Sequence, residues 1–168
     1  MNAETKVPGH EEHFVIERSF DAPAALVYQA WTEPEHFKQW IAPEGYSIPF
    51  CEIDLRVGGK LKFAMRGPTG EDHWCGGEYL ELDPPRRIVS TDYFCDPEGN
   101  ILQPAEIGLP ESWPAVNIVT ITFTEEGGRT HVKVDQPMVS LAAAKALGAD
   151  VGWNSSLDNL AALLKKLA

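Results

Sequence analysis

The sequence predicts an α+β domain, in which a curved antiparallel sheet of about seven strands packs against a long C-terminal helix. Three observations lead to this fold class. Short segments with alternating apolar and polar residues are separated by turn-forming Gly, Pro and Asp residues. Two brief stretches with helical spacing follow the first such segment, and a longer one with a single apolar stripe ends the chain. That stripe must be buried against the sheet, so a sheet that curves around the helix would leave a pocket between the two layers.

The first part of the chain is predicted to form one strand and two short helices. The strand covers residues 13–20, where apolar residues alternate with polar ones. Asp21 is expected to cap a helix over residues 24–31. Thr32 is expected to cap a second short helix, which ends near Trp40, before a proline and a glycine.

Six further strands are predicted in the middle of the chain. Glycine-rich, proline-rich or acidic turns separate most of them, so neighbouring strands should pair as antiparallel hairpins. The first of the six is expected to place Cys51, Ile53, Leu55 and Val57 on one face. The predicted strands cover residues 47–57, 60–66, 73–82, 88–95, 116–124 and 130–136.

The segment from Asp96 to Pro114 has no periodicity and contains four prolines and two glycines. A loop of this length inside a compact domain is usually functional or mobile. It also carries apolar residues, which suggests that it folds back over an apolar surface. We therefore expect it to lie at the mouth of the pocket.

The end of the chain is the clearest helix. Trp153, Leu157, Leu160, Leu164 and Leu167 follow one another at steps of four and three residues, which makes one apolar stripe. Nothing resembles a linker, so residues 1–168 are interpreted as a single domain. The polar residues 1–12 are expected to lack regular structure.

Composition excludes several classes of function. The formal net charge of −11 repels phosphate backbones and anionic lipids, so neither nucleic acid nor an anionic membrane is an expected partner. No stretch approaches the ~18 apolar residues of a membrane span, and membrane insertion is not expected. The chain starts without a secretory signal, and its three cysteines lack C-x-x-C spacing, which favours a reduced cytoplasm.

The common cofactor and metal motifs are not found in the sequence. There is no G-x-G-x-x-G fingerprint, P-loop or H-E-x-x-H pair, so neither a cofactor nor a metal is expected. The five histidines are scattered along the chain. Cys75 could serve as a nucleophile, but a cysteine in a buried strand is usually a small inert hydrophobe.

The most specific hypothesis about chemistry comes from the hairpin around Pro84-Pro85. If it turns there, Glu78 lies opposite Asp92 on a mostly apolar face, although the register could slip by two residues. Two facing acids raise the pKa of at least one of them, and a protonated acid can donate a hydrogen bond or transfer a proton. Solvation of that face, or pairing of either acid with Arg56, Arg66 or Lys133, is the alternative. His73 and Tyr93 are further candidate catalytic residues.

Large aromatic residues from several predicted elements are candidate walls of the pocket. Such rings suit a flat or apolar ligand, but they would equally suit an ordinary core. Trp31 and Trp40, on the short helices, are expected to pack structurally. The residues predicted to line the pocket are Trp74, Glu78, Asp92, Phe94, Trp113, Trp153 and Leu157.

Four blocks of sequence resemble, in order, the family named after the activator of Hsp90 ATPase, within the START-like (Bet v 1-like) superfamily. They are residues 31–40 (WTEPEHFKQW), 53–59 (IDLRVGG), 77–88 (GEYLELDPPRRI) and Gly152-Trp153 with Leu157, Asp158 and Leu160. The resemblance covers nearly the whole chain and implies a helix-grip fold with a hydrophobic cavity. That superfamily includes lipid carriers, hormone receptors, aromatases and cyclases. The chain resembles only the C-terminal type of domain of the eukaryotic activators, so Hsp90 is not an expected partner.

Three functions are therefore compared. The leading one is binding of a small hydrophobic or aromatic molecule in an internal cavity. The second is an enzyme of cyclase, aromatase or hydrolase type that uses acids in the cavity. The third is a protein-interaction domain that stimulates a chaperone ATPase. The oligomeric state is left open, with a homodimer among the alternatives.

Overall fold

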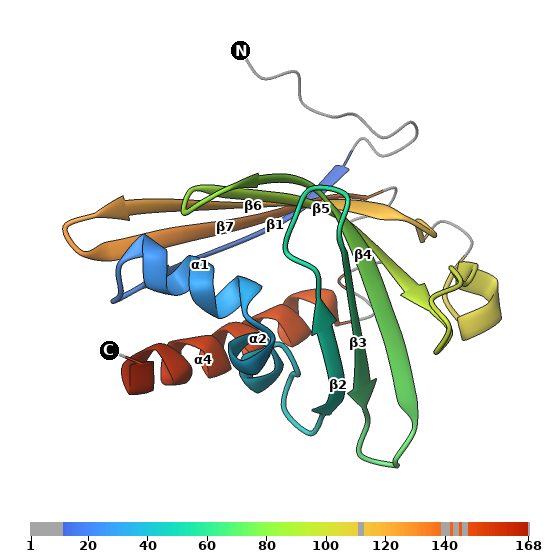
Figure 1. The fold of residues 1–168 in the computed structure, drawn as a ribbon. Helices are drawn as coiled ribbons and strands as arrows, with labels where there is room; N and C mark the ends of the chain where they lie inside the picture. Colours follow the sequence, from blue (N-terminus) through green and yellow to red (C-terminus); the bar gives the residue numbers. More distant parts are fainter. Residues whose placement is uncertain (1–11, 111–112, 139–141, 143–144, 146–147, 168) are drawn as a thin grey trace.

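The computed structural model describes residues 12–110, 113–138, 142, 145 and 148–167. Residues 1–11, which were expected to lack regular structure, lie outside the described residues. No helix among the described residues is long and apolar enough to cross a membrane. The elements are β1 (Glu12–Phe20), α1 (Ala24–Thr32), α2 (Pro34–Trp40), β2 (Ser47–Ile53), β3 (Lys60–Arg66), β4 (Asp72–Asp83), β5 (Arg87–Cys95), the 3₁₀ turn η1 (Pro104–Ile107), β6 (Asn117–Glu126), β7 (Arg129–Met138) and α4 (Ala149–Leu167) (Figure 1).

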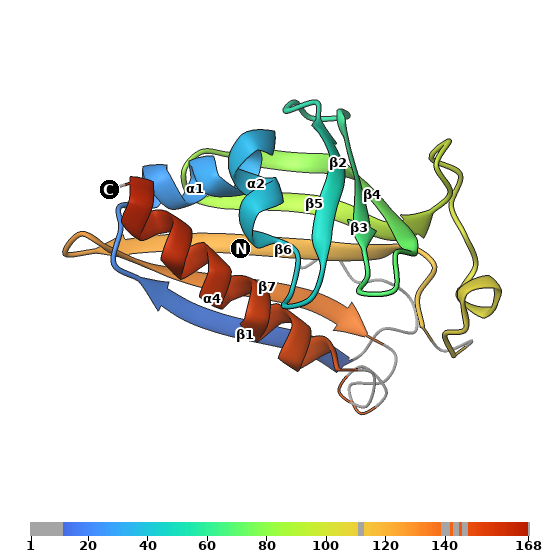
Figure 2. The same cartoon turned by 90° about the horizontal axis from the view of Figure 1, so that it is seen from below.

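The strands form one seven-stranded antiparallel sheet in the order β1-β7-β6-β5-β4-β3-β2. Sequential hairpins join β2 to β5, and β6 to β7, while β1 closes the far edge by pairing with β7. The sheet bends strongly, so β2, β3 and β4 turn down beside the helices (Figures 1 and 2). The predicted α+β helix-grip architecture is confirmed.

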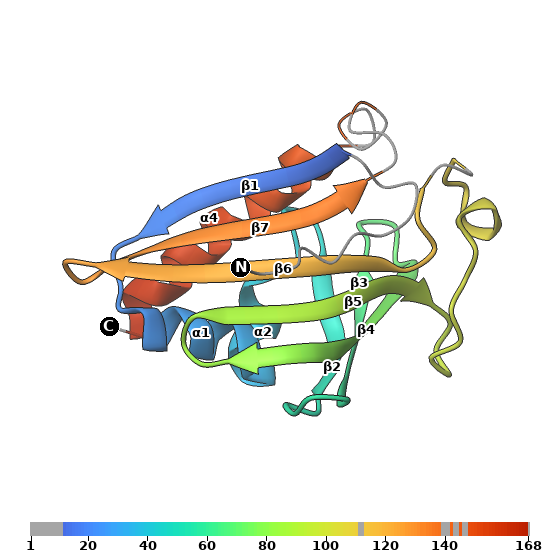
Figure 3. The same ribbon diagram turned by 90° about the horizontal axis from the view of Figure 1, so that it is seen from above.

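Helices α1, α2 and α4 lie on the concave face of the sheet, and the view from above shows none of them over the convex face (Figures 2 and 3). The predicted stripe of α4 faces the sheet: Leu157, Leu160 and Leu164 are almost fully buried. Trp40 of α2 is fully buried, and its indole Nε1 donates to the Ala30 carbonyl at 2.9 Å. This contact ties α1 to α2 and gives Trp40 the structural role predicted for it.

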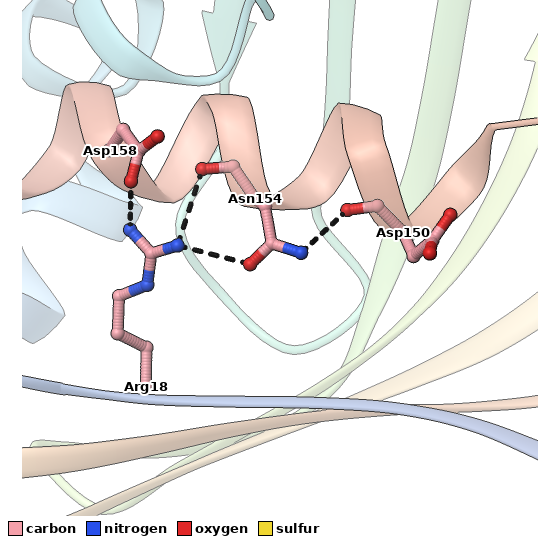
Figure 4. Close-up of polar contacts among 4 residues, drawn as sticks. All are labelled: Arg18, Asp150, Asn154 and Asp158. Atoms are coloured by element: carbon pink, nitrogen blue, oxygen red, sulfur yellow. Dashed lines mark hydrogen bonds and ion pairs between the residues drawn. The ribbon is translucent and has the colours of Figure 1, made fainter.

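A polar clasp joins the edge strand β1 to the middle of α4 (Figure 4). Arg18 Nη1 donates to Asp158 Oδ1 at 2.5 Å, and Nη2 donates to Asn154 Oδ1 at 3.0 Å. The Asn154 side-chain amide then donates to the Asp150 carbonyl at 2.9 Å. The clasp fixes the position of α4 along the concave face.

Two sequence predictions about helix starts were wrong. The backbone N–H of Ala24 donates to Glu125 Oε1 at 2.7 Å, so a side chain from the β6–β7 hairpin, and not Asp21, serves the start of α1. The hydroxyl of Thr32 donates to the Tyr28 carbonyl at 2.9 Å and belongs to the last turn of α1. Helix α2 starts with Pro34 at its first position instead.

The predicted strand over residues 47–57 was also too long. Strand β2 ends at Ile53, and backbone hydrogen bonds fold the next residues into a turn, with Asp54 N–H donating to the Lys60 carbonyl. Leu55 and Val57 are consequently exposed. Their alternation with polar residues looked like a strand because a turn of this length can continue the same pattern by chance.

Candidate functional site

A cavity of about 1270 Å³ lies between the concave face of the sheet and the N-terminal half of α4. Its walls come from α1, α2, α4, the strands β3 to β7, and the loop after β5. The lining is mainly apolar, as in most sites for small molecules. Among the aromatic residues that line it are Trp31, Phe37, Phe63, Tyr79, Phe94, Trp113 and Trp153.

The first turns of α4 present mostly small side chains to the cavity, and Trp153 is the large exception. Ala149 and Gly152 line the cavity, whereas the large leucines of the helix begin at Leu157. A Cβ atom added to Gly152 would meet no atom within 4 Å. The same helix therefore fills the space in its second half and leaves it open in its first.

The loop after β5 forms one side of the cavity, through Leu102, Ile107, Leu109 and Trp113. Within it, η1 is held by reciprocal hydrogen bonds between Gln103 and Glu106, a capped turn that sequence periodicity did not reveal. Apolar side chains of the loop thus line the cavity, which agrees with the expectation that the loop folds back over an apolar surface. That the loop lies at the mouth of the pocket stays a prediction.

The floor of the cavity carries a polar group on three adjacent strands. Strand β5 presents Ser90 and Asp92, strand β6 presents Asn117, and strand β7 presents Gln136. Asp92 pairs directly with Asn117 across β5 and β6. Thr120 pairs with Asp135, so Gln136 lies one position further along, beside Val119 on the same face.

Asp92 is the acid of this floor. Its side chain has accessible surface, but that surface opens into the cavity, and protein surrounds the carboxyl group. This burial raises the pKa of Asp92 to about 6, because the charged form loses hydration. Among the described residues no hydrogen bond or ion pair engages its carboxyl oxygens. Asp92 can therefore accept or donate a proton close to neutral pH.

The two amides of the floor are buried with hydrogen-bonding capacity left over. Asn117 is 5% exposed and Gln136 is 7% exposed. Asn117 Oδ1 accepts from the Ile118 N–H at 2.9 Å, which leaves its NH₂ group unpaired within the described part of the chain. The Gln136 side chain makes no hydrogen bond with any described residue. Among the described residues, neither amide is one of the side-chain groups that are fully buried without a partner, so their unpaired atoms open onto the cavity, where a ligand can bind them.

The expected pairing of Glu78 with Asp92 was wrong. The predicted register holds at the turn, where Leu82 pairs with Ile88, but it shifts by one residue between Tyr79 and Glu81. A one-residue shift exchanges the faces of a strand, so Gly77, and not Glu78, lies opposite Asp92. Glu78 lies on the convex face, and its N–H donates to Thr91 Oγ1 at 2.9 Å. Arg66 pairs with Asp72 and Arg56 with Asp54, so neither engages Glu78 or Asp92.

The other predicted cavity residues are distributed as follows. Phe94, Trp113 and Trp153 line the cavity, and so does Trp74, whose ring also packs on Phe50 at 5.4 Å. Leu157 does not line it, because the residue is fully packed in the core beside α1.

Of the candidate catalytic residues, His73 and Tyr93 border the cavity. Cys75 also borders it, and burial raises the pKa of its thiol, so this cysteine stays in the unreactive protonated form. No group of three or more His, Cys, Asp or Glu residues that could hold a metal ion occurs in the described residues.

Sequence reasoning missed several residues of the site, among them Trp31, Tyr79, Asn117 and Gln136. A signal for the two amides was available. Asn117 is in phase with the buried Val119 and Ile121, and Gln136 is in phase with the buried Val134. A polar residue in the apolar phase of a strand is a reason to look for a functional site.

Residues 21–165 match the model of the family described as activator of Hsp90 ATPase homolog 1-like protein. The chain belongs to this family. The match covers β2 to β7, both short helices and nearly all of α4, and it includes every residue that lines the cavity. No curated protein is significantly similar to the chain.

Solved structures of bacterial proteins share the fold. One from Mycobacterium smegmatis is 26% identical, with 90% of each chain covered and a TM-score of 0.74. One from Chromobacterium violaceum is 30% identical over 90% of this chain and 96% of that one, with a TM-score of 0.70. One from Staphylococcus epidermidis is 28% identical over 100% of this chain and 96% of that one, with a TM-score of 0.74.

Proposed function

We propose that this domain binds a small, mainly apolar molecule that carries at least one polar group. The observation that carries the proposal is the unpaired polar floor of Asp92, Asn117 and Gln136 in a cavity of about 1270 Å³. Apolar walls supply affinity through burial, and a few convergent polar groups orient the ligand. The volume suits a molecule of drug or lipid size.

Two measurements test this proposal. Native mass spectrometry of freshly purified protein, compared with the denatured mass, is expected to show a non-covalent adduct of small-molecule size. Titration with the neutral fluorophore N-phenyl-1-naphthylamine is expected to show saturable binding. Ser90→Phe places a ring in the cavity and is expected to weaken that binding by roughly tenfold or more.

Thr124→Phe is the matched control, because Thr124 is exposed and alternates with the buried Phe123 on the same sheet. It should bind the fluorophore like the wild type. The proposal fails if Ser90→Phe binds the fluorophore as well as the wild type and native spectra show only the bare chain.

A second candidate function is proton transfer on a bound substrate, favoured by the pKa of about 6 for Asp92. If a ligand found in native spectra is converted by the protein, Asp92→Asn should abolish turnover while the ligand still binds. Turnover that survives in Asp92→Asn would remove Asp92 as the acid or base.

The expectations about macromolecular partners and location remain proposals. The net charge of −11 supports the absence of nucleic acid as a partner. A cytoplasmic location, which the cysteine pattern supports, and the absence of Hsp90 stimulation are proposed as well. A chaperone ATPase assay with the purified domain tests the latter: a rise in the ATPase rate would contradict it.

A further inference from the structure

The charged groups of the cavity are of one sign. Among the described residues that line it there is no Lys and no Arg. The lining carboxylates are Glu44, Asp72, Asp92 and Asp96. A ligand with a carboxylate or phosphate would therefore enter without a counter-charge and would lie close to Asp92.

Asp72 and Asp96 have hydrogen-bond or ion-pair partners, and Glu44 lies outside the sheet. Asp92 lies on the sheet and has no such partner among the described residues. Asp72 is paired with Arg66 at 2.8 Å, and Asp96 accepts hydrogen bonds from the N–H groups of Glu98 and Asn100 in its own loop. Glu44 is exposed in the segment that follows α2. Only the carboxyl group on the floor is both enclosed and unpaired within the described structure.

Two amide side chains, on β6 and β7, carry oxygens that can accept from a hydrogen-bond donor. Asn117 lies opposite Asp92 and its Oδ1, which accepts from the Ile118 N–H, keeps a second lone pair, while Gln136 lies on the next strand with its oxygen unpaired among the described residues. Both side chains line the cavity, and both residues are more than nine-tenths buried. The aromatic side chains of Tyr79, Phe94 and Trp153 line the same cavity. A positive charge is stabilised both by a carboxylate and by aromatic faces.

We propose that the ligand is an apolar amine, whose ammonium group pairs with Asp92 and is oriented by Asn117 and Gln136. The inference rests on the proposed function, and it names the class of ligand that the cavity selects. An ammonium cation supplies the counter-charge that this cavity lacks. It also donates up to three hydrogen bonds, which suits one carboxylate and two amide oxygens.

Binding should depend on pH in a definite direction. Below pH 6 the carboxyl group of Asp92 is protonated and cannot pair with an ammonium ion, so amine affinity should fall as the pH is lowered. Other titratable groups line the cavity: Asp72, His73 and Cys75 on β4, Asp96 after β5, and Glu44 after α2. The part of α4 that lines it is uncharged, and so are the lining residues of β6 and β7.

The test uses three probes with one apolar body: 1-naphthylmethylamine, 1-naphthalenemethanol and 1-naphthoic acid. Isothermal titration calorimetry at pH 7.5 is expected to show the amine binding about tenfold more tightly than the alcohol, and the acid most weakly. At pH 5 the amine and the alcohol should bind alike. Asp92→Asn should bind the alcohol like the wild type and lose the preference for the amine.

Glu78→Gln is the matched control, because it also replaces an acid by its amide but lies on the convex face, next to the residue opposite Asp92. It should keep the preference for the amine. His73→Gln shows whether the histidine contributes: loss of the pH dependence in this variant would overturn the assignment to Asp92.

The failures of the two proposals are distinguishable. Binding of the alcohol with no preference for the amine, in the wild type at pH 7.5, overturns the amine assignment and leaves the binding function in place. Tighter binding of the acid does the same. If none of the three probes binds, and no adduct is seen in native spectra, both proposals are overturned.

Discussion

The two halves of α4 face the same sheet but leave very different spaces against it. In the second half, Leu157, Leu160 and Leu164 are at most 4% exposed and fill the space above the sheet. In the first half, Ala149 and Gly152 border a cavity of about 1270 Å³. One continuous helix thus packs tightly against the sheet in its second half and borders a cavity in its first, where Trp153 is its largest side chain.

Along β5, β6 and β7, the residues on the concave face of the sheet change from apolar to polar. Ile88, Ile121 and Val134 lie side by side on β5, β6 and β7 and are almost fully buried, and Ile88 and Ile121 also border the cavity. Further along the same strands, Asp92, Asn117 and Gln136 take the positions on that face. The antiparallel register sets Asp92 opposite Asn117, and Gln136 beside Val119, two residues further along β6, so residues far apart in the sequence build one polar floor. The comparison teaches that polar residues on the sheet, at the end where α4 leaves space, distinguish the site from the packed core.

The largest expected effect comes from truncating a buried side chain in the packed half of α4. Leu160→Ala should lower the free energy of unfolding by about 3–5 kcal/mol, because Leu160 is fully buried and its removal leaves a void. Phe94→Ala, in the cavity, removes more atoms but should cost only about 1–2 kcal/mol, since the ring borders empty space. Urea unfolding followed by circular dichroism measures both. Equal losses would contradict the division of the molecule into packed and open halves.

Part of the fold and of the site could be predicted from the sequence. The parts that could not be predicted have physical reasons. The stripe of α4 and the face of β5 that carries Ile88, Ser90, Asp92 and Phe94 follow from periodicity, and the structure has both. The bulge at Leu80 could not be predicted, because alternation on either side of an extra residue looks regular. It moved Glu78 off the predicted site.

The helix starts show a second limit. The N–H of Ala24 is served by Glu125, about a hundred residues further along the chain, and local capping patterns contain no information on such a contact. The cavity has the same origin. The cavity depends on the distance between α4 and the bent sheet, and that distance cannot be read from the residues of the helix alone.

The second expected effect concerns the charge on the floor. The pKa of Asp92 is raised, so between about pH 4 and pH 6 the unfolded chain loses this proton while the folded chain keeps it. The folded state then binds more protons, and stability falls as the pH rises through this range. The full shift corresponds to about 3 kcal/mol, and screening by water in the cavity should reduce it to about 1–2 kcal/mol.

Asp92→Asn should therefore be more stable than the wild type by about 1–2 kcal/mol at pH 7.5, and about equally stable at pH 4. Denaturant unfolding at a series of pH values measures the difference. Glu78→Gln is the control and should show no comparable gain at pH 7.5. If Asp92→Asn were no more stable at pH 7.5, the carboxylate would already have a partner, and the floor would not be poised for a ligand.

The smallest expected effect tests the open half of α4 directly. Gly152→Ala should raise the free energy of unfolding by roughly 0.5–1 kcal/mol, because alanine favours the helix and its Cβ atom meets nothing within 4 Å. Gly77→Ala is the contrasting variant: its Cβ atom would lie 2.1 Å from the Thr91 carbonyl oxygen, so it should destabilise the sheet. Thermal unfolding compares the two. A loss of stability in Gly152→Ala would mean that the first turns of α4 lie closer to the sheet than the cavity allows, and the contrast between the two halves of the helix would not stand.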